Sequence, residues 1–399
     1  MKPRNVVLVI ALLSLAVKIY CAATTVGTRD AVFFYQFADF IHDHGLIAMY
    51  RYTPFFNHTP LIGWFSEGCY LLAGGDTQIF GFYLRLGPIL FDLFGVVALL
   101  WLREKTGRPA WWVIGLFAAS PASFAVSAFH GNVDSMLAIA VLLAGVACAA
   151  DRPALCGFFL GLSCNIKIIP LLLAPVFFFL WWQRGKPWRF FGPATLTILV
   201  GWGYPLLTIP RIFLHNVLGY SSVWGVWGFT YPLRLFGPVS MQTLGFMKQT
   251  PEQATIILCV KLVIVAAILG VAWRRRTVPL LEVFGTLSIA WSIFFVLSPG
   301  FGPHYLVWLA PCVLVASEKW FGALTLTSSA ACLAYYTMVC GRIPWNFGDG
   351  GYHLAEKWAP WMVPAWLVIT GFLIAALRTK PPTELPTSTD AEPTLATVA

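Results

Sequence analysis

Charged residues are scarce in this chain. Only 11% of its 399 residues are Asp, Glu, Lys or Arg, whereas 58% are hydrophobic. Soluble globular domains carry about 25% charged residues, so this deficit excludes an ordinary soluble fold. Apolar runs long enough to cross a bilayer, each of about 20 residues, recur from one end of the sequence to the other. The composition therefore predicts an all-α, polytopic membrane protein.

Two further patterns are missing. The nine cysteines show neither CxxC nor zinc-ligand spacing, which argues against a disulfide framework and a structural zinc. The net charge of +9 is not gathered on a basic face interleaved with aromatics, so a nucleic-acid partner is not expected. Instead, the basic residues form short clusters between apolar runs, as at Arg103–Arg108 and Arg274–Arg276. Such clusters mark the cytoplasmic loops of membrane proteins.

The apolar runs predict about twelve transmembrane helices, with both termini in the cytoplasm. In this topology the cytoplasmic segments contain 15 Lys and Arg residues. The segments on the opposite side contain 8, although the loops on that side are longer. We expect one integral membrane domain over residues 1–378 and a disordered cytoplasmic tail over 379–399, which is rich in Pro and Thr. Long loops are predicted outside at 24–78, 210–252 and 340–357, and loops of this length are usually functional.

The first of these loops holds an acid at a suggestive place. Phe33, Phe34, Phe37, Phe40 and Ile41 form an apolar stripe at helical spacing, which predicts a helix lying in the membrane interface. Asp30 stands shortly before this helix. Asp is favoured as a helix cap, so capping is one interpretation. A catalytic carboxylate beside the membrane surface is the other.

Two later stretches combine polar residues in ways that suit a site. The segment His130-Gly-Asn-Val-Asp134 joins two apolar runs. The start of a helix would explain Asn132 and Asp134 but not His130. Binding of sugar hydroxyls would explain all three polar side chains, and both interpretations stay open. Lys167 interrupts the apolar stretch 154–182. A lysine in mid-membrane costs roughly 2.5–3.5 kcal/mol, so it either extends to the interface or faces a partner, such as a lipid-linked phosphate.

Several of these motifs resemble a known group of enzymes. The acid after the first apolar run, His-Gly-x-x-Asp-Ser at 130–135, Gly161–Pro170 and Gly302–Pro311 resemble the GT-C integral membrane glycosyltransferases. The resemblance is greatest to glycosyltransferase family 87 and to related mannosyl- and glucosyltransferases that use polyprenyl-phosphate sugars. It covers nearly the whole chain in layout, although each motif is short.

The resemblance implies an inverting transfer of a hexose, with mannose or glucose favoured, from a polyprenyl-phosphate donor to a lipid-linked or cell-envelope glycan. Asp30 would be the general base, and Lys167, Arg211 and His304 would bind the donor phosphate. We expect the sugar or acceptor to contact His130, Asn132, Asp134, His58 and Tyr305. No metal and no cofactor are predicted, because Arg29-Asp30 is not the Asp-x-Asp or Asp-Glu pair that some relatives carry. The active site would face the periplasm of a bacterial cytoplasmic membrane.

The main alternative is a multi-pass transporter or flippase of a lipid-linked or anionic substrate. Such proteins are expected to carry broken helices with charges at mid-bilayer, and internal repeats. The sequence has one broken stretch, at Asn165–Lys167, and no convincing repeat. The pattern favours the glycosyltransferase.

Overall fold

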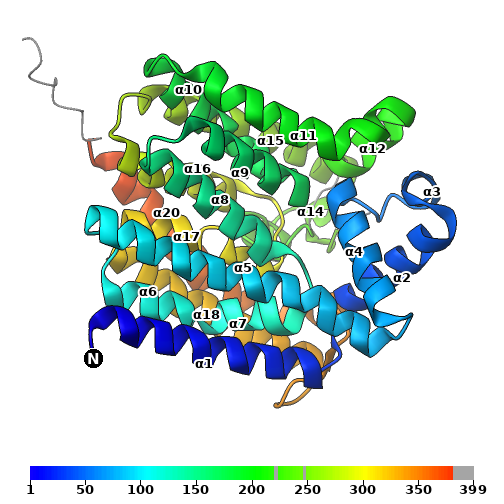
Figure 1. Cartoon of the computed structure of the whole chain (residues 1–399). Helices are drawn as coiled ribbons and strands as arrows, with labels where there is room; N and C mark the ends of the chain where they lie inside the picture. The colour runs from blue at the N-terminus through cyan, green and yellow to red at the C-terminus, as the bar shows by residue number, and fades with distance from the viewer. Residues whose placement is uncertain (220–222, 246–248, 381–399) are drawn as a thin grey trace, which may run out of the picture.

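Helices make up almost the entire structure. It is a computed structural model that describes residues 1–219, 223–245 and 249–380. Most helices lie side by side in one bundle (Figure 1). The tail predicted to be disordered covers residues 379–399, of which 381–399 lie outside the described residues.

Eight helical segments of the described chain are long and apolar enough to cross a membrane. The prediction of an all-α, polytopic membrane fold is therefore confirmed. The long segments are α1 (Pro3–Thr24), α5 (Thr77–Thr106), α6 (Trp111–Ala118) with α7 (Pro121–Phe124) and the π-helix η1 (Ala125–His130), α11 (Pro187–Thr208), α15 (Pro251–Arg274), η3 (Leu280–Glu282) with α16 (Val283–Leu297), α18 (Glu318–Cys340), and α19 (Ala355–Trp358) with η6 (Ala359–Met362) and α20 (Val363–Arg378).

At the positions of the other predicted transmembrane helices, the described residues form four shorter apolar segments. Eight of the about twelve predicted spans are therefore long enough to cross a membrane. The short segments are α8 (Asp134–Ala149), α9 (Pro153–Ile166), η2 (Ile169–Leu173) with α10 (Ala174–Gln183), and η4 (Pro303–Val307) with α17 (Ala310–Ala316).

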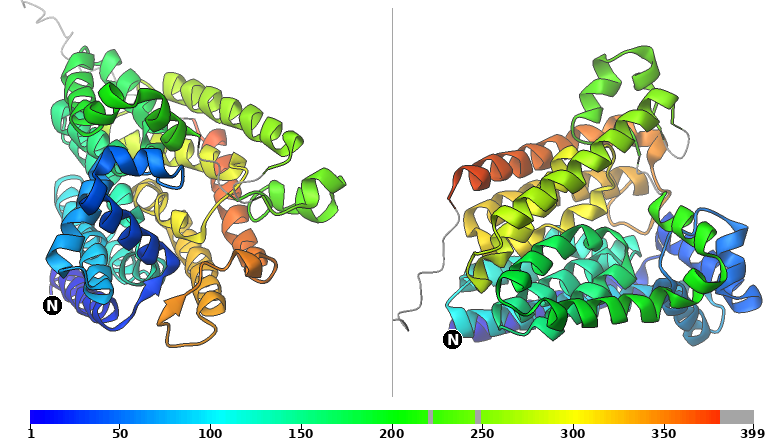
Figure 2. Two further views of the ribbon diagram at one scale, coloured as in Figure 1. Left: turned by 90° about the vertical axis from the view of Figure 1, so that its right-hand side faces the viewer. Right: turned by 90° about the horizontal axis from the view of Figure 1, so that it is seen from above.

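The three long loops contain more secondary structure than their sequences suggested. Helices from the first loop lie at the end of the bundle opposite the N-terminus, and Figure 2 (left) looks onto that end. The loop elements are β1 (Gly27–Thr28), α2 (Arg29–His44), α3 (Leu46–Tyr52) and α4 (Pro60–Ala73) in the first loop, α12 (Pro210–Leu218), α13 (Thr230–Phe236) and α14 (Val239–Gln242) in the second, and β2 (Phe347–Gly348) and η5 (Tyr352–Leu354) in the third.

The predicted first-loop helix exists as α2, but its apolar face is mainly a packing face. Phe34, Phe37 and Ile41 are buried, and α2 packs against α4 and α5. Phe33 keeps 37% of its surface exposed. The capping interpretation of Asp30 is wrong, because Thr28 is at the N-cap position and Asp30 lies in the first turn.

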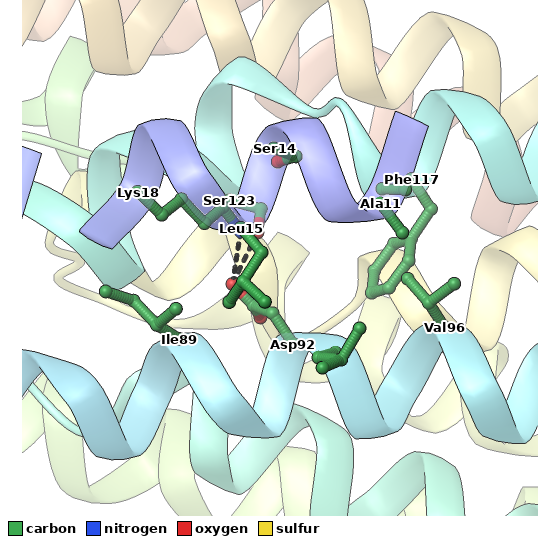
Figure 3. Close-up of a pocket in the computed structure, with 11 residues that line it drawn as sticks. Ala11, Ser14, Leu15, Lys18, Ile89, Asp92, Val96, Phe117 and Ser123 are labelled. Atoms are coloured by element: carbon green, nitrogen blue, oxygen red, sulfur yellow. Dashed lines mark hydrogen bonds and ion pairs between the residues drawn. The ribbon is translucent and has the colours of Figure 1, made fainter. Parts of the chain in front are cut away.

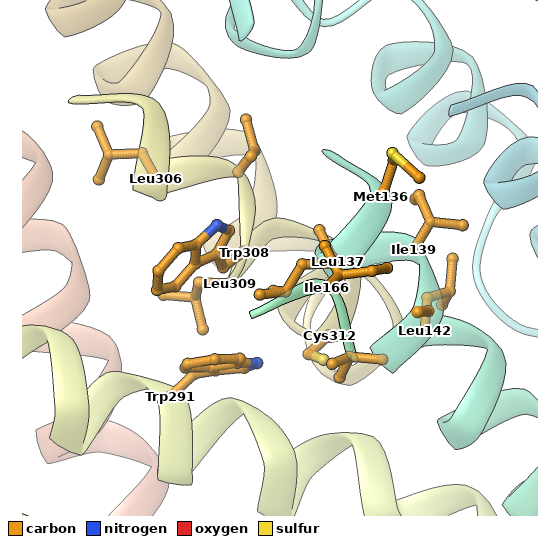
Figure 4. Packing of buried hydrophobic residues seen from close by; sticks show 14 of the residues in the cluster. Met136, Leu137, Ile139, Leu142, Ile166, Trp291, Leu306, Trp308, Leu309 and Cys312 are labelled. Carbon is orange, nitrogen blue, oxygen red and sulfur yellow. The ribbon is translucent and has the colours of Figure 1, made fainter. Parts of the chain in front are cut away.

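The bundle is organised around α8, which is buried on nearly every side. A helix that is apolar all round belongs inside a protein rather than at its surface. Met136, Leu137, Ile139 and Leu142 of α8 belong to the main hydrophobic core, which also includes Trp308 (Figure 4). This packing fixes the start of α8, where Asp134 lies.

The intramembrane charges on α5 have structural partners. Lys18 of α1 donates to Asp92 at 2.6 Å and to the Ser123 hydroxyl at 2.8 Å (Figure 3). Arg85, which is fully buried, donates to the carbonyls of Ala22 and Thr25 at the end of α1. Arg85 and Asp92 therefore join α5 to α1.

A short parallel pairing joins the first loop to the third. Gly27 pairs with Phe347 and Thr28 with Gly348. Directly beyond it, Arg29 donates to Asp349 at 2.8 Å. The backbone that leads into Asp30 is therefore held by a segment from near the other end of the chain.

Candidate active site

One oxygen of Asp30 is hydrogen-bonded to one neighbouring side chain and lies close to a second. Its Oδ2 accepts a hydrogen bond from Asn132 Nδ2 at 2.8 Å and lies 3.2 Å from His130 Nε2. The Asp30 side chain is 36% exposed, whereas that of His130 is 2% exposed. The carboxylate is therefore fixed by buried groups but can be reached from outside.

The same surroundings keep Asp30 ionised. Burial alone would raise its pKa, but the charges and hydrogen bonds of its neighbours outweigh that effect. The imidazole of His130 contributes most to this, followed by His304 and the Asn132 amide, and together they hold the pKa of Asp30 below its ordinary value. Asp30 is thus a carboxylate, and not a carboxylic acid, at neutral pH.

The turn after His130 brings these groups to α2. His130 ends the π-helix η1, a rare element that often marks functional sites. Gly131 follows with φ of 80°, and a Cβ there would come within 2.8 Å of the Ala31 Cβ. Only glycine suits this position. Val133, and not Asn132, is the N-cap of α8, so the Asn132 amide is available to Asp30.

Asp134 and Lys167 form the second half of the site. Asp134 is fully buried and accepts from Lys167 Nζ at 2.7 Å and from Trp308 Nε1 at 2.8 Å. The Lys167 ammonium also lies 4.9 Å from the centre of the Tyr305 ring, and its side chain is 14% exposed. Lys167 therefore has a partner inside the protein, and the interpretation that it extends freely to the interface is wrong.

Two stacked imidazoles connect the halves. The rings of His130 and His304 lie 4.3 Å apart with an interplanar angle of 24°. His304 Nε2 is 3.8 Å from Asp134 Oδ2, and its ring is 4.2 Å from that of Tyr305. The polar groups thus run without interruption from Asp30 to Lys167.

His58 lies at the margin of this cluster. Its ring packs 4.8 Å from that of Phe34. Burial lowers the pKa of His58 to about 3, the charge of Lys167 adds to this, and that of Asp30 opposes it. The next residue, Thr59, donates its hydroxyl to the Asn165 carbonyl and so ties this segment to the break before Lys167.

Arg211 is the one expected site residue that the structure does not bring to the cluster. It is exposed at the start of α12. Within the described residues, no hydrogen bond, ion pair or ring contact joins Arg211 to the cluster. Sequence reasoning in turn missed Thr28, Trp308 and Tyr336, which contact the cluster through residues far away in the sequence.

Three side chains could approach one metal ion. Asp30, His130 and His304 offer ligand atoms within 4.8 Å of one another. The rings of His130 and His304 are stacked with an interplanar angle of 24°. In-plane lone pairs of stacked rings do not meet at one point, so one ring would have to turn for both to bind the same ion.

Several buried polar atoms around this space lack a hydrogen-bond partner among the described residues. They include His58 Nδ1, His130 Nε2, His304 Nδ1 and Asp134 Oδ2. Leaving such a group unpaired costs about 1–3 kcal/mol, so native proteins rarely do it without a reason. A ligand with several hydroxyls would satisfy these atoms.

Comparisons with known proteins were made for the whole chain. The model of glycosyltransferase family 87 matches residues 83–299, more than half of the sequence. The match includes His130 and Lys167, while Asp30 and His304 lie outside it. GPI mannosyltransferase 1 of Eremothecium gossypii is 24% identical over 271 residues, which cover 62% of this chain and 64% of that protein. The match thus spans somewhat less than two thirds of this curated relative.

Proposed function

The chain belongs to glycosyltransferase family 87, and from this membership we propose that it is a membrane enzyme that transfers a hexose, with Asp30 as general base. The donor is a polyprenyl-phosphate sugar, and the acceptor is a hydroxyl of a lipid-linked or cell-envelope glycan. Mannose is favoured over glucose by the name of the fungal relative. The observation that carries the proposal is the ionised, accessible Asp30 within a buried polar cluster.

The unpaired atoms support a sugar as the ligand. Hydroxyl groups both donate and accept, so one hexose ring can satisfy a carboxylate oxygen and imidazole nitrogens together. Asp134 Oδ2 and His304 Nδ1 are buried and unpaired among the described residues. Tyr305, stacked on Trp308 at 4.4 Å, adds aromatic surface beside Lys167.

Asp30 has one oxygen available for the acceptor. Its Oδ2 is held by Asn132 and His130, which leaves Oδ1 for the incoming hydroxyl. The acceptor oxygen attacks the anomeric carbon while its proton passes to Oδ1. The bond from that carbon to the phosphate oxygen breaks, and polyprenyl phosphate leaves with the electron pair on the opposite face. Attack opposite the leaving group inverts the anomeric centre.

Lys167 stabilises the leaving phosphate. Negative charge grows on the phosphate in the transition state, and a fixed cation in a buried site lowers the energy of that charge. Asp134 and Trp308 hold the ammonium from one side. The exposed 14% of the Lys167 side chain is the part left for the donor.

Replacement of Asp30 tests the proposal. Asp30→Asn keeps the shape and the contact to Asn132 but cannot take the proton. We expect kcat for transfer from a polyprenyl-phosphate mannose to fall by about 10²–10⁴-fold, the usual share of a general base, while donor binding is retained. Asp39→Asn, on the same helix and hydrogen-bonded to Tyr70, is the matched control and should stay active. An Asp30→Asn enzyme with more than a tenth of the native rate would remove Asp30 from this role.

A further inference from the structure

The ends of three membrane helices bring six cations to one corner of the bundle. α10 packs against both α11 and α15. α10 and the start of α11 lie at the end of the bundle that holds the N-terminus (Figure 1). Near the end of α15, the ring centre of Trp273 lies 5.3 Å from that of Phe179 on α10. The cations of this basic corner are Arg184, Lys186, Arg189, Arg274, Arg275 and Arg276.

Two cations of the basic corner remain available for a ligand. Arg189 at the start of α11 and Arg274 at the end of α15 are exposed. Within the described residues, neither forms a hydrogen bond or an ion pair. Lys186, by contrast, donates to Asp151 at 2.8 Å. The corner therefore keeps an excess of positive charge on the two helices that flank α10.

Another basic cluster at the same end of the bundle, near the end of α5, is accompanied by acids. Arg4 pairs with Glu104 at 3.1 Å, and Arg108 pairs with Glu282 at 3.3 Å. The positive charge of that cluster is therefore partly cancelled. The basic corner keeps the larger excess, and clustered Lys and Arg at a membrane surface attract anionic lipid headgroups.

Exposed tryptophans accompany the cations of the basic corner. Trp182, Trp188 and Trp273 keep 56%, 72% and 51% of their surface exposed. The guanidinium of Arg276 lies 4.0 Å from the centre of the Trp273 ring. Tryptophan is enriched at the depth of the lipid headgroups in membrane proteins. This surface is therefore suited to hold its cations at the depth of the lipid phosphates.

Apolar side chains continue from the basic corner along the same helices. α11 exposes Phe191 and Leu196, and α15 exposes Leu262 and Leu269. Between the two helices, the ring centre of Phe178 on α10 lies 6.1 Å from that of Phe191. A lipid whose headgroup lies at the corner can therefore place its acyl chains along these faces.

We propose that the basic corner binds the phosphate headgroup of an anionic phospholipid. Arg189 and Arg274 supply the available cations, and the acyl chains lie along the exposed faces of α11 and α15. The inference goes beyond the proposed function and does not depend on it. The corner and the first-loop helices, which carry Asp30, lie at opposite ends of the bundle (Figure 1).

Native mass spectrometry of the full-length protein in a non-ionic detergent measures the binding of single lipids. Phosphatidylglycerol, which is anionic, is compared with phosphatidylcholine, which has no net charge, on the same acyl chains. We expect phosphatidylglycerol to bind saturably and at least about ten-fold more tightly, because each available cation contributes about five-fold near an anionic headgroup. Equal affinity for the two lipids would overturn the inference.

Glycerol 3-phosphate, which has the phosphate but no acyl chains, separates a lipid from a soluble ligand. In excess, it should leave phosphatidylglycerol bound to the native protein. Displacement of the lipid would make the corner a site for soluble phosphates and would contradict the proposal.

Paired substitutions test the place of binding. Arg189→Gln combined with Arg274→Gln should weaken phosphatidylglycerol binding about 25-fold, from about five-fold for each cation. Both side chains are exposed, so the Tm of this variant without added lipid should match that of the native protein. Lys105→Gln with Lys319→Gln is the matched control, because it also removes two exposed cations, from other helices.

The control variant should bind phosphatidylglycerol like the native protein. Native affinity in the Arg189 and Arg274 variant, or an equal loss in both double variants, would show that the lipid is not bound at the basic corner. None of these measurements uses glycosyl transfer, so an active Asp30→Asn enzyme would end the proposed function and leave the lipid site standing.

Discussion

The two carboxylates of the site differ in what surrounds them. Asp134 is fully buried against an ammonium and an indole N–H, so its charge is already neutralised. Asp30 is partly exposed and is held by an amide and an imidazole. Asp134 is therefore suited to hold Lys167 and bind a sugar hydroxyl, whereas Asp30 is suited to meet an acceptor.

At the residue scale, the sequence identified the members of the site better than their partners. Lys167 interrupts an apolar stretch, and His130 and Asp134 lie between two apolar runs. Asp30 is an acid that follows the first apolar run. Their pairings were not predictable, because Lys167 and Asp134 are separated by 33 positions. Thr28, two positions before Asp30, carries no chemical signal of its own until the fold places it on His130.

Lys167 and Arg211, both expected to bind the donor phosphate, can be compared directly. Lys167→Gln should raise donor KM about ten-fold or more, because it removes a cation from the cluster. Arg211→Gln should change donor KM less, because Arg211 is exposed and has no contact with the cluster among the described residues. Steady-state kinetics with a polyprenyl-phosphate sugar measures both.

A control is needed because Lys167→Gln leaves the Asp134 carboxylate buried without its cation, which can destabilise the fold. Lys167→Gln combined with Asp134→Asn removes both charges and should fold while its donor KM stays high. A native donor KM in the single and the double variant would contradict phosphate binding by Lys167. A larger effect of Arg211→Gln than of Lys167→Gln would move the phosphate site toward α12.

At the element scale, hydropathy located the long helices because a membrane span must be apolar over its whole length. It also predicted the break near Lys167, where α9 ends at Ile166. It did not reveal α3 or α4 in the first loop, although Pro60 and Gly74 bound α4 as typical start and stop residues. The π-helix that ends at His130 has no simple sequence signature.

The ion pair between α1 and α5 offers a test of how these elements are joined. Lys18→Met leaves Asp92 buried without its cation and should destabilise the protein by roughly 3–5 kcal/mol. Lys18→Met with Asp92→Leu removes both charges and should recover most of that loss, since neither charge then needs a partner. Thermal unfolding of the purified protein in detergent compares the three. If the double variant is no more stable than the single one, the pair is not the main link between these helices.

At the scale of the whole molecule, the two ends of the described chain lie far from the candidate active site. The N-terminus and the end of α20 lie at one end of the bundle, and the first-loop helices lie at the other (Figure 1). The predicted topology likewise puts both termini on one side of the membrane and the first loop on the other. Apart from the turns between helices, the other elements that lie outside the predicted spans come from the second and third long loops.

Labelling of single cysteines tests this arrangement across a membrane. In a background without the native cysteines, Tyr52→Cys in the exposed part of the first loop should react with a membrane-impermeant reagent from outside the cell. Thr379→Cys, just beyond α20, should react only after the membrane is permeabilised. Reaction of both from the same side would overturn the predicted topology.

The pairing of β1 with β2 also bears on how the protein is made. The backbone before Asp30 is ordered by Phe347 and Gly348, and Arg29 meets a partner 320 positions later. The ribosome synthesises the first loop long before the third long loop, which contains Asp349. During synthesis, the backbone before Asp30 therefore lacks its pairing partners until the third long loop has been made. Completion of the site can thus serve as a late checkpoint on the insertion of every helix in between.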